Sequence, residues 1–382
     1  MIEPKKFYCY LKGEGISFFT GVPDSLLNDF CLYLSDNISK EEHIIAANEG
    51  NAIGIATGSY LATGKTPLVY MQNSGIGNAL NPLISLTNKE TYSIPMVLLI
   101  GWRGAPGTND WTHHKKQGEE SPRILETLDI PYKELNTTED EEVLEMIQWA
   151  TKTACEKSSP VALLANKGVL EKGQKKDLLL EESELTMSRE EAIETIIKTV
   201  PKDALFVATT GRATREIYEV RNKCGMNHDH DFLNVGSMGH ASSIVAGIAM
   251  GQKERLVVCL DGDAAALMHM GAMPIIGSSG LSNILHVVLN NGVHESVGGQ
   301  PSIAHKINFT GVAKSVGYQT IEGEVKTKKG LVNAINRLLL NEKKPAFIDM
   351  HIRQGIRKDI PKLDVSLEEV KKNLMKAIKK TQ

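Results

Sequence analysis

Short apolar runs alternate with longer amphipathic segments along most of the chain. In the first half, apolar runs predict β-strands at residues 16–21, 43–47, 67–72, 95–101 and 160–166. Apolar side chains at helical spacing predict helices between them, at residues 25–37, 49–64, 75–88 and 141–157. Continuous apolar strands separated by helices favour a parallel sheet that is covered on both faces.

A charge-rich segment, residues 171–187, interrupts this pattern and predicts a linker. The pattern then restarts with Ser188 and Glu191, which have the spacing of a helix capping box. Further strands are predicted at residues 204–211, 231–237, 255–263, 283–291 and 345–352, and a final helix at 366–380. The sequence therefore predicts an α/β protein with two doubly wound parallel-sheet domains, residues 1–170 and 188–382, and no middle domain.

Composition narrows the possible partners. The 382 residues are 41% hydrophobic and 23% charged, with a net charge of −3. Without a basic excess we expect no nucleic-acid or membrane partner, and no apolar run is long enough to span a bilayer. The N-terminus lacks the apolar core of a signal peptide. The five cysteines are scattered and form no Cys-x-x-Cys pair, so we expect reduced thiols in a cytoplasmic protein.

Polar residues follow the predicted strands where ligands of such sheets bind. Asp263 follows one strand of the second half, and Asn291 follows the next strand. Parallel neighbours would bring both side chains together, and their oxygens suit Mg²⁺ when phosphate oxygens complete its coordination. The alternative is structural, because Asp is common at helix N-caps and Asn–Gly is common in turns.

The stretch from Gly262 to Gly292 resembles the diphosphate-binding motif of thiamine-diphosphate-dependent enzymes, a Gly-Asp-Gly followed by two asparagines. The resemblance implies that Asp263, Asn291 and the main chain of Val293 hold Mg²⁺. Ala264 stands where the motif has its second glycine. Because alanine adopts positive φ at a cost, we expect residue 264 to have right-handed helical or extended backbone.

Glu49 lies between an apolar strand and a glycine-rich helix. Such a glutamate is either a charge at a helix N-terminus or a functional acid. The family segment E-x-x-A-x-x-x-A-x-G-Y-A is resembled here by Glu49, Ala52, Ala56, Gly58 and Tyr60. The resemblance implies that Glu49 binds N1′ of the aminopyrimidine ring as the catalytic acid, a role that a raised pKa suits.

The same resemblance assigns thiamine diphosphate and Mg²⁺ as cofactors, with residues 1–170 binding the pyrimidine and 188–382 the diphosphate. In this family two subunits share the site, so we expect a homodimer or a larger homo-oligomer. Met238 would hold the cofactor bent, although a core methionine is the alternative. The expected cofactor residues are Glu49, Asn73, Thr210, Gly211, Gly236, Met238, Gly239, His240, Gly262, Asp263, Ala264, Ala265, Asn291 and Val293.

Within the family, the absence of a middle domain and residues 18–30, 71–83, 112–120 and 290–302 resemble the phosphonopyruvate decarboxylases. Sulfopyruvate decarboxylases are their close relatives. The resemblance implies decarboxylation of 3-phosphonopyruvate to phosphonoacetaldehyde and CO₂, in phosphonate biosynthesis. The alternatives are sulfopyruvate or another small 2-oxo acid as the substrate.

A phosphonate requires cationic groups and N–H donors. We expect a glycine-rich loop at residues 101–120 to supply them, although each cation alone could be a solvated surface charge. The substrate candidates are Asp24, Ser25, Arg103, His113 and Lys116. The catalytic candidates here are His113 and His114. The alternative proton donors are His114 and His294, and His294 lies in a segment, residues 294–301, that could close over the cofactor.

A reading from another class is a dinucleotide-dependent dehydrogenase or a nucleotide-binding module without this chemistry. It requires Gly-x-Gly-x-x-Gly directly after a first strand. The glycines at residues 13–15 precede their strand, and residues 20–25 lack the glycines. The sequence therefore disfavours this alternative.

Overall fold

The computed structural model describes residues 1–170, 185–340, 344–355, 357, 359–361 and 363–379. These residues form two compact units. Unit 1 is Met1–Leu178 with Ser296–Gln300, and unit 2 is Leu179–Glu295 with Pro301–Gln382. Most of the predicted linker, residues 171–184, lies outside the described residues, so the boundaries of the two domains stay a prediction.

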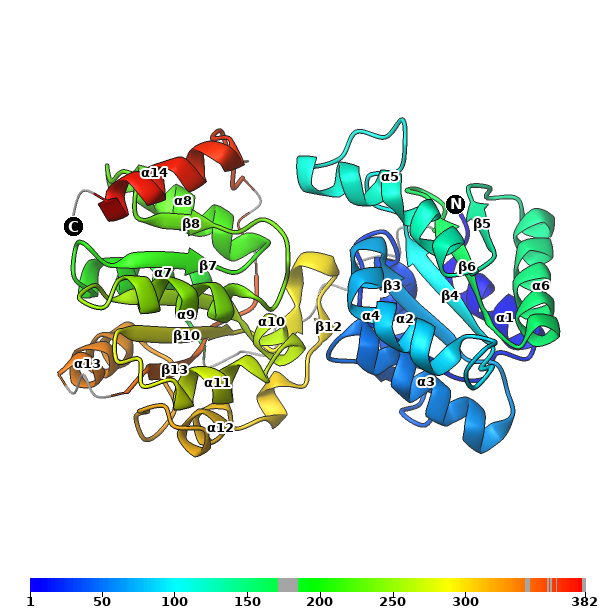
Figure 1. Ribbon diagram of the computed structural model, residues 1–382, viewed down its shortest axis with the longest axis horizontal. Helices are drawn as coiled ribbons and strands as arrows, with labels where there is room; N and C mark the ends of the chain where they lie inside the picture. Colours follow the sequence, from blue (N-terminus) through cyan, green and yellow to red (C-terminus); the bar gives the residue numbers. More distant parts are fainter. Residues whose placement is uncertain (171–184, 341–343, 356, 358, 362, 380–382) are drawn as a thin grey trace. The chain divides into compact units, whose positions relative to one another are not determined.

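Unit 1 contains a six-stranded sheet with the order β2-β1-β3-β4-β6-β5, in which all neighbours are parallel (Figure 1). Its strands are β1 Phe19–Gly21, β2 His43–Ile45, β3 Leu68–Gln72, β4 Met96–Gly101, β5 Tyr132–Leu135 and β6 Pro160–Ala165. Its helices are α1 Pro4–Gly13, α2 Asn28–Asn37, α3 Glu49–Thr63, α4 Ile76–Pro82, α5 Thr112–Thr127 and α6 Asp140–Lys157. A short π-helix, Leu83–Thr87, continues α4.

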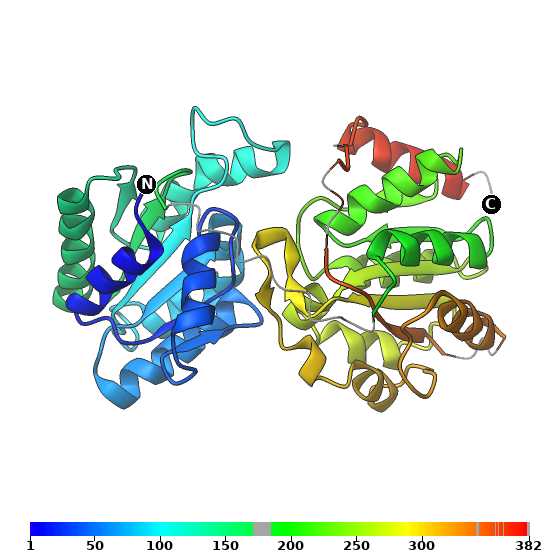
Figure 2. The same cartoon turned by 180° about the vertical axis from the view of Figure 1, so that it is seen from behind.

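Unit 2 contains a five-stranded parallel sheet with the order β13-β10-β9-β7-β8 (Figure 2). Its strands are β7 Leu205–Ala208, β8 Asp231–Leu233, β9 Val257–Gly262, β10 Ile284–Asn290 and β13 Ala346–His351. Two short strands, β11 Val293–His294 and β12 Gln300–Pro301, pair separately. The helices are α7 Arg189–Thr199, α8 Arg212–Lys223, α9 Ala241–Gly251, α10 Asp263–Met268, α11 Ala272–Ser278, α12 Phe309–Ser315, α13 Lys328–Leu339 and α14 Leu367–Lys379.

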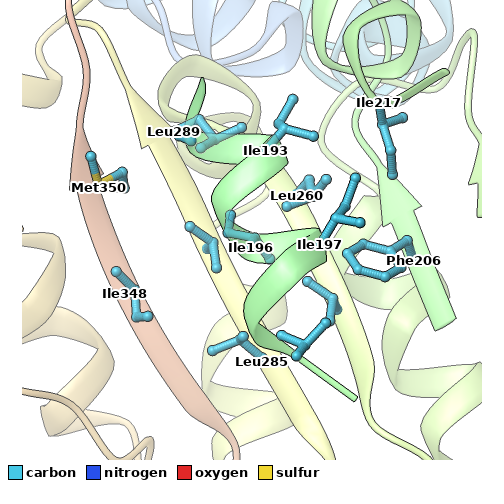
Figure 3. Packing of buried hydrophobic residues seen from close by; sticks show 14 of the residues in the cluster. Ile193, Ile196, Ile197, Phe206, Ile217, Leu260, Leu285, Leu289, Ile348 and Met350 are labelled. Atoms are coloured by element: carbon cyan, nitrogen blue, oxygen red, sulfur yellow. The ribbon is translucent and has the colours of Figure 1, made fainter. Parts of the chain in front are cut away.

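Each sheet is buried on both faces because its strands are apolar at successive positions. In β4 all six residues are buried: Val97 and Leu99 join one apolar cluster, whereas Leu98 and Ile100 join the cluster on the other face. In unit 2, Ile193 and Ile196 of α7 pack on sheet residues such as Leu260 (Figure 3). Burial of each such side chain stabilises the fold by roughly 1.5–3 kcal/mol.

The predicted fold class is confirmed, and each predicted strand contains an observed one. The capping box is also confirmed, because the Ser188 side chain accepts the Glu191 N–H and the Glu191 side chain accepts the Ser188 N–H. Two local expectations were wrong or incomplete. Residues 112–120, predicted as part of a loop, lie in α5, and β5 was not predicted.

Across the described ranges, no helix is both long enough and apolar enough to cross a bilayer. The five cysteines are free thiols, as predicted.

Candidate functional site

Glu49 is the first residue of α3 and follows an N-cap, Asn48, whose side chain accepts the Asn51 N–H. A glutamate at this position usually reaches solvent, yet Glu49 is only 5% exposed. Burial raises the pKa of its carboxyl group above the usual range. The structure therefore combines both readings of Glu49, since the residue opens a helix and is also a buried acid.

The Glu49 carboxyl group is held by α4 and the turn before it. Nδ2 of Asn78 donates to Oε2 at 2.7 Å, which opposes the effect of burial on the pKa. A Cβ atom on Gly75 would lie 2.4 Å from Oε1 of Glu49, so the close approach requires glycine at position 75. One carboxyl oxygen is thus engaged by an amide, and the other faces a glycine.

Arg103 follows β4 and lies in a hydrogen-bonded cluster. Its Nε and Nη2 donate to the two oxygens of Asp110 at 2.7 and 2.5 Å, and Nη1 donates to Oγ of Ser25 at 2.7 Å. The main-chain N–H groups of Gly104 and Trp111 also donate to Asp110. This bidentate pair fixes the guanidinium and balances its charge.

Asp24 interacts electrostatically with Arg103 and is fully buried. Burial raises its pKa to about 6, although the Leu26 N–H and the charge of Arg103 oppose the shift. Within the described part of the chain, Oδ1 of Asp24 has no hydrogen-bond partner. A Cβ atom on Gly101 would lie 2.0 Å from Oδ2, so β4 approaches this carboxyl group closely.

The candidate histidines lie in the first turn of α5. The rings of His113 and His114 are 4.1 Å apart. Burial and then Arg103 lower the pKa of both, to about 4 for His114. Lys116 has 74% of its side chain exposed and forms an ion pair with Glu120, so it does not join the Arg103 cluster through a direct bond.

His294 lies in β11, in unit 2. Burial lowers its pKa to about 4, so its imidazole is neutral at pH 7.

Asn73 is engaged by protein groups. Its Nδ2 donates to the Arg103 carbonyl and to Oγ of Ser121, at 2.9 and 3.0 Å, and its Oδ1 accepts the Arg103 N–H. These bonds use both amide hydrogens of Asn73. The contacts of Asn73 therefore fix the main chain at Arg103.

In unit 2, β9 and β10 are parallel neighbours, with Gly262 opposite Leu289. Asp263 begins α10 directly after β9 and is buried, which raises its pKa. Ser302 links the two motifs: its hydroxyl donates to Asp263 Oδ2 at 2.6 Å, and its N–H donates to the Gly292 carbonyl at 2.8 Å. The expected proximity of the two strand ends is confirmed.

The Asn291 side chain is oriented by its neighbours. Its Nδ2 donates to Oε2 of Glu295 at 3.2 Å, and its Oδ1 accepts the Val293 N–H at 3.2 Å. Gly292 has φ of 70°, and a Cβ atom there would lie 1.8 Å from Nε2 of His305. The turn that places Asn291 and Val293 therefore requires glycine between them.

The end of β7 offers polar atoms beside β9. Thr209 Oγ1 and Arg212 Nε are buried, with no hydrogen-bond partner in the described ranges. Thr210 and Gly211 lie between them, and Gly211 has φ of 95° as the N-cap of α8. A Cβ atom on Gly262 would lie 3.9 Å from the Thr209 methyl group, so the two strand ends are adjacent.

The segment before α9 makes its own turn contacts. The N–H groups of Gly236 and His240 donate to Asn234 and Ser237, so both are already engaged. Gly239 has φ of 84°, and a Cβ atom there would lie 3.1 Å from the Ala265 carbonyl. Met238 is half-buried rather than part of the core.

Asp261 has a structural partner beneath the strand ends. Its Oδ2 lies 3.3 Å from Nε2 of His286, and its Oδ1 accepts the Gly262 N–H. The ligand atoms of Cys259, Asp261 and His286 all lie within 4.8 Å of one another, and all three residues are buried. The histidine provides a polar partner for a carboxyl group in an apolar layer.

Comparison with known proteins gives the family. Residues 6–121 match the thiamine pyrophosphate enzyme, N-terminal TPP binding domain, and residues 210–350 match the C-terminal TPP binding domain. Phosphonopyruvate decarboxylase of Streptomyces viridochromogenes is 30% identical over 374 residues, which cover 93% of this chain and 89% of the relative. The chain belongs to the thiamine-pyrophosphate-dependent decarboxylases.

Two sulfopyruvate decarboxylases are also similar to this decarboxylase. The protein of Methanosarcina acetivorans is 27% identical, covering 96% of this chain and 95% of the relative. Sulfopyruvate decarboxylase subunit beta of Methanothermobacter thermautotrophicus is 31% identical, covering 51% of this chain and 97% of that subunit.

The decarboxylase has donor groups that fit the cofactor of its family. The unpartnered Thr209 hydroxyl and Arg212 Nε–H can bind diphosphate oxygens. Asp263 and Asn291 offer carboxylate and amide oxygens, the ligand types that Mg²⁺ prefers. In unit 1, Asn78 donates to one carboxyl oxygen of Glu49, and the other carboxyl oxygen lies against Gly75.

Sequence reasoning missed the polar residues that hold the candidates in place. These are Asn78 at Glu49, Asp110 at Arg103, Ser302 at Asp263 and Glu295 at Asn291. Ser302 and Glu295 were inside a stretch that the family resemblance had marked, but no periodicity assigns their partners. Their contacts depend on how the strand ends and loops pack.

Proposed function

We propose that this chain decarboxylates 3-phosphonopyruvate to phosphonoacetaldehyde and CO₂, using thiamine diphosphate and Mg²⁺. The observation that carries the substrate is the 30% identity to a phosphonopyruvate decarboxylase across 93% of the chain. The buried acid and the fixed arginine of unit 1 supply groups that this reaction requires. A cytoplasmic location and a role in phosphonate biosynthesis are part of this proposal.

Bound thiamine diphosphate supplies a cationic ring that accepts the electron pair left when CO₂ departs. Glu49 is the residue that shares a proton with the pyrimidine. Asn78 uses one lone pair of Oε2, and we infer that Oε1 carries the shared proton. The raised pKa of Glu49 suits a group that must gain and lose a proton near neutral pH.

Asp263, Asn291 and the Val293 carbonyl would hold Mg²⁺, as the family resemblance implies. Thr209 and Arg212 would bind the diphosphate, together with the Thr210 and Gly211 main chain. The N–H groups of Gly236 and His240 already have acceptors, so we infer a supporting role for these two residues.

Arg103, Ser25 and Asp24 would contact the substrate. The Ser25 hydroxyl and the guanidinium are held together, so they present donors in a fixed geometry. His113 or His114 would donate the proton to the product. Burial and Arg103 lower the pKa values of both imidazoles, so an approaching phosphonate dianion would favour their cationic form.

Sulfopyruvate is the second candidate substrate, because a sulfopyruvate decarboxylase is 27% identical over 96% of the chain. Asp110 balances the charge of Arg103, so this cluster is less cationic than the sequence suggested. Charge at Arg103 therefore gives little preference for a dianion over a monoanion, and similarity to the relatives is the stronger guide.

The deciding experiment compares CO₂ release from phosphonopyruvate and sulfopyruvate in the presence of thiamine diphosphate and Mg²⁺. We expect a higher kcat/KM for phosphonopyruvate, and a preference for sulfopyruvate would select the second candidate. A thermal-shift measurement tests the cofactors separately. Thiamine diphosphate with Mg²⁺ should raise the Tm, whereas NAD should leave it unchanged.

A further inference from the structure

Three distant segments of unit 2 meet in a buried ion cluster. Arg189 begins α7, Glu216 lies in α8, and Glu295 follows β11. Arg189 Nε and Nη2 donate to the two oxygens of Glu216 at 2.5 and 3.0 Å, and Nη1 donates to Oε2 of Glu295 at 2.9 Å. The three side chains are 12%, 3% and 11% exposed, so the arginine anchors both carboxylates away from solvent.

Glu295 connects this cluster to the Asn291 turn. Its Oε2 accepts Asn291 Nδ2 at 3.2 Å, and its Oε1 accepts the Gly355 N–H at 2.6 Å. Nε2 of the neighbouring Gln354 donates to the Asn291 carbonyl at 3.3 Å. The carboxylate is therefore bonded to a guanidinium, an amide side chain and a main-chain N–H at once.

This arrangement decides which way the Asn291 amide points. An ionised carboxylate can only accept hydrogen bonds, so the NH₂ group of Asn291 must face Glu295 and its Oδ1 must face away. Oδ1 accepts the Val293 N–H, and an amide oxygen has a second lone pair for another ligand. A metal requires that oxygen and is repelled by the NH₂ group.

We propose that Glu295 is a positioning residue which, anchored by Arg189 and Glu216, orients the Asn291 oxygen toward the metal of the cofactor site. The inference rests on the proposed Mg²⁺ and diphosphate site, and it adds a function for three residues outside the proposed set of metal ligands. Partners that orient a metal ligand in this way typically change metal affinity on the order of 10- to 100-fold when they are replaced.

The competing explanation is that the cluster only stabilises the fold. A second buried pair in unit 2 provides a matched control, since Arg221 and Asp231 form two bonds of 2.7 and 2.8 Å and are 8% and 0% exposed. Asp231 begins β8, whereas Asn291 follows the end of β10. Because the strands are parallel, Asp231 lies at the amino ends of the strands, and Asn291 lies at their carboxyl ends.

The test compares Glu295→Gln with Asp231→Asn in the full-length protein. Glutamine keeps the size of the side chain but can donate as well as accept, so it no longer dictates the amide orientation. Binding of thiamine diphosphate is followed by calorimetry at a series of Mg²⁺ concentrations. We expect the half-saturating Mg²⁺ concentration to rise at least tenfold for Glu295→Gln and to change less than twofold for Asp231→Asn.

Urea unfolding of the cofactor-free variants separates affinity from stability. If Glu295→Gln loses stability but keeps the wild-type Mg²⁺ dependence, the cluster is structural and the proposal is wrong. If Glu295→Gln does not fold, Glu216→Gln takes its place, because it weakens the anchor while Glu295 remains, and an unchanged Mg²⁺ dependence would again overturn the proposal. Wild-type protein that binds thiamine diphosphate without Mg²⁺ would instead overturn the proposed metal site, and this inference with it.

Discussion

At the scale of single residues, unit 1 buries two carboxyl groups in different surroundings. Glu49 has an amide donor, Asn78, beside its carboxyl group, whereas Oδ1 of the fully buried Asp24 has no hydrogen-bond partner among the described residues. A buried carboxylate is costly unless hydrogen bonds or charges compensate it. The two acids should therefore respond differently when their environment is changed.

Removal of the amide beside Glu49 should impair its ionisation. Asn78→Ala removes a hydrogen bond to the carboxylate, so the pKa of Glu49 should rise further and the acid limb of the pH–rate profile should move to higher pH. A hydrogen bond to a charged group contributes roughly 1.5–3 kcal/mol, which corresponds to a loss of about 10- to 100-fold in turnover below that limb. The measurement is kcat as a function of pH.

Asn81 provides the control, because it lies on the same helix and accepts from Ser85 rather than contacting Glu49. Asn81→Ala should keep the wild-type pH–rate profile. An unshifted acid limb in Asn78→Ala would show that the amide does not act on Glu49.

Asp24 should destabilise the folded chain at neutral pH. Its pKa is about 6 when folded, against an ordinary 3.8, so the folded state binds more protons between these values and stability falls as pH rises through them. Two units of pKa correspond to about 3 kcal/mol. Asp24→Asn should therefore raise the free energy of unfolding by up to about 3 kcal/mol at pH 8 and change it little at pH 4.

Urea denaturation at the two pH values measures this difference, and turnover of the same variant reports on the substrate role of Asp24. A variant that is no more stable than wild type at pH 8 would contradict the effect of burial. A variant that gains stability but loses turnover would show that the buried acid is retained for function.

At the scale of elements, the strand–helix turn after β9 accounts for the alanine that departs from the family motif. Gly262 has extended backbone, and α10 begins at the next residue, so Ala264 is helical. This confirms the expected backbone at residue 264. Because no positive φ is required there, alanine is compatible with the turn and favours the helix.

Restoring the glycine should therefore weaken the fold. Ala264→Gly should lower the free energy of unfolding by roughly 0.5–1 kcal/mol and should leave the affinity for thiamine diphosphate with Mg²⁺ unchanged. Denaturation and calorimetry on the same variant check both expectations. Tighter cofactor binding by the glycine variant would show that the alanine constrains the diphosphate loop.

Apolar periodicity predicted most elements and missed those whose pattern is not apolar. The buried residues of α5 are His114, Gly118, Ser121 and Leu125, which have helical spacing but include only one apolar side chain. A Cβ atom on Gly118 would lie 1.8 Å from the Gly104 carbonyl, so this buried position requires glycine. Strand β5 has one neighbour and a mainly polar surface, so a search for apolar runs does not find it.

The candidate site also contains residues that the sequence predicted and residues that it did not. Asp263 and Asn291 were predicted because they end successive parallel strands, a relationship that the order of elements determines. Their partners were not, because these contacts follow no sequence pattern: Ser302 is 39 residues from Asp263, and Glu295 contacts both nearby Asn291 and Arg189, 106 residues away. Such a pair depends on the packing of loops over the sheet edge, which no local pattern encodes.

At the scale of the whole molecule, the proposed cofactor contacts are divided between the two units. Glu49 lies in unit 1, and Asp263 lies in unit 2. If one cofactor requires both, the acid and the metal ligand come either from one chain or from two copies. The family resemblance favours two copies, and subunit mixing distinguishes these possibilities.

Glu49→Gln should bind cofactor without turnover, and Asp263→Ala should lose Mg²⁺-dependent binding, so each variant alone is inactive. In a dimer that contains one of each, a shared site combines the intact Glu49 of one copy with the intact Asp263 of the other, and the second site carries both changes. Random exchange makes half of the dimers mixed, so about a quarter of wild-type activity should return. A site within one chain would carry one change in every copy, and mixing would restore nothing.

Two affinity tags isolate the mixed dimer, whose expected activity is about half of wild type for a shared site. As the control, each variant exchanged with itself should stay inactive.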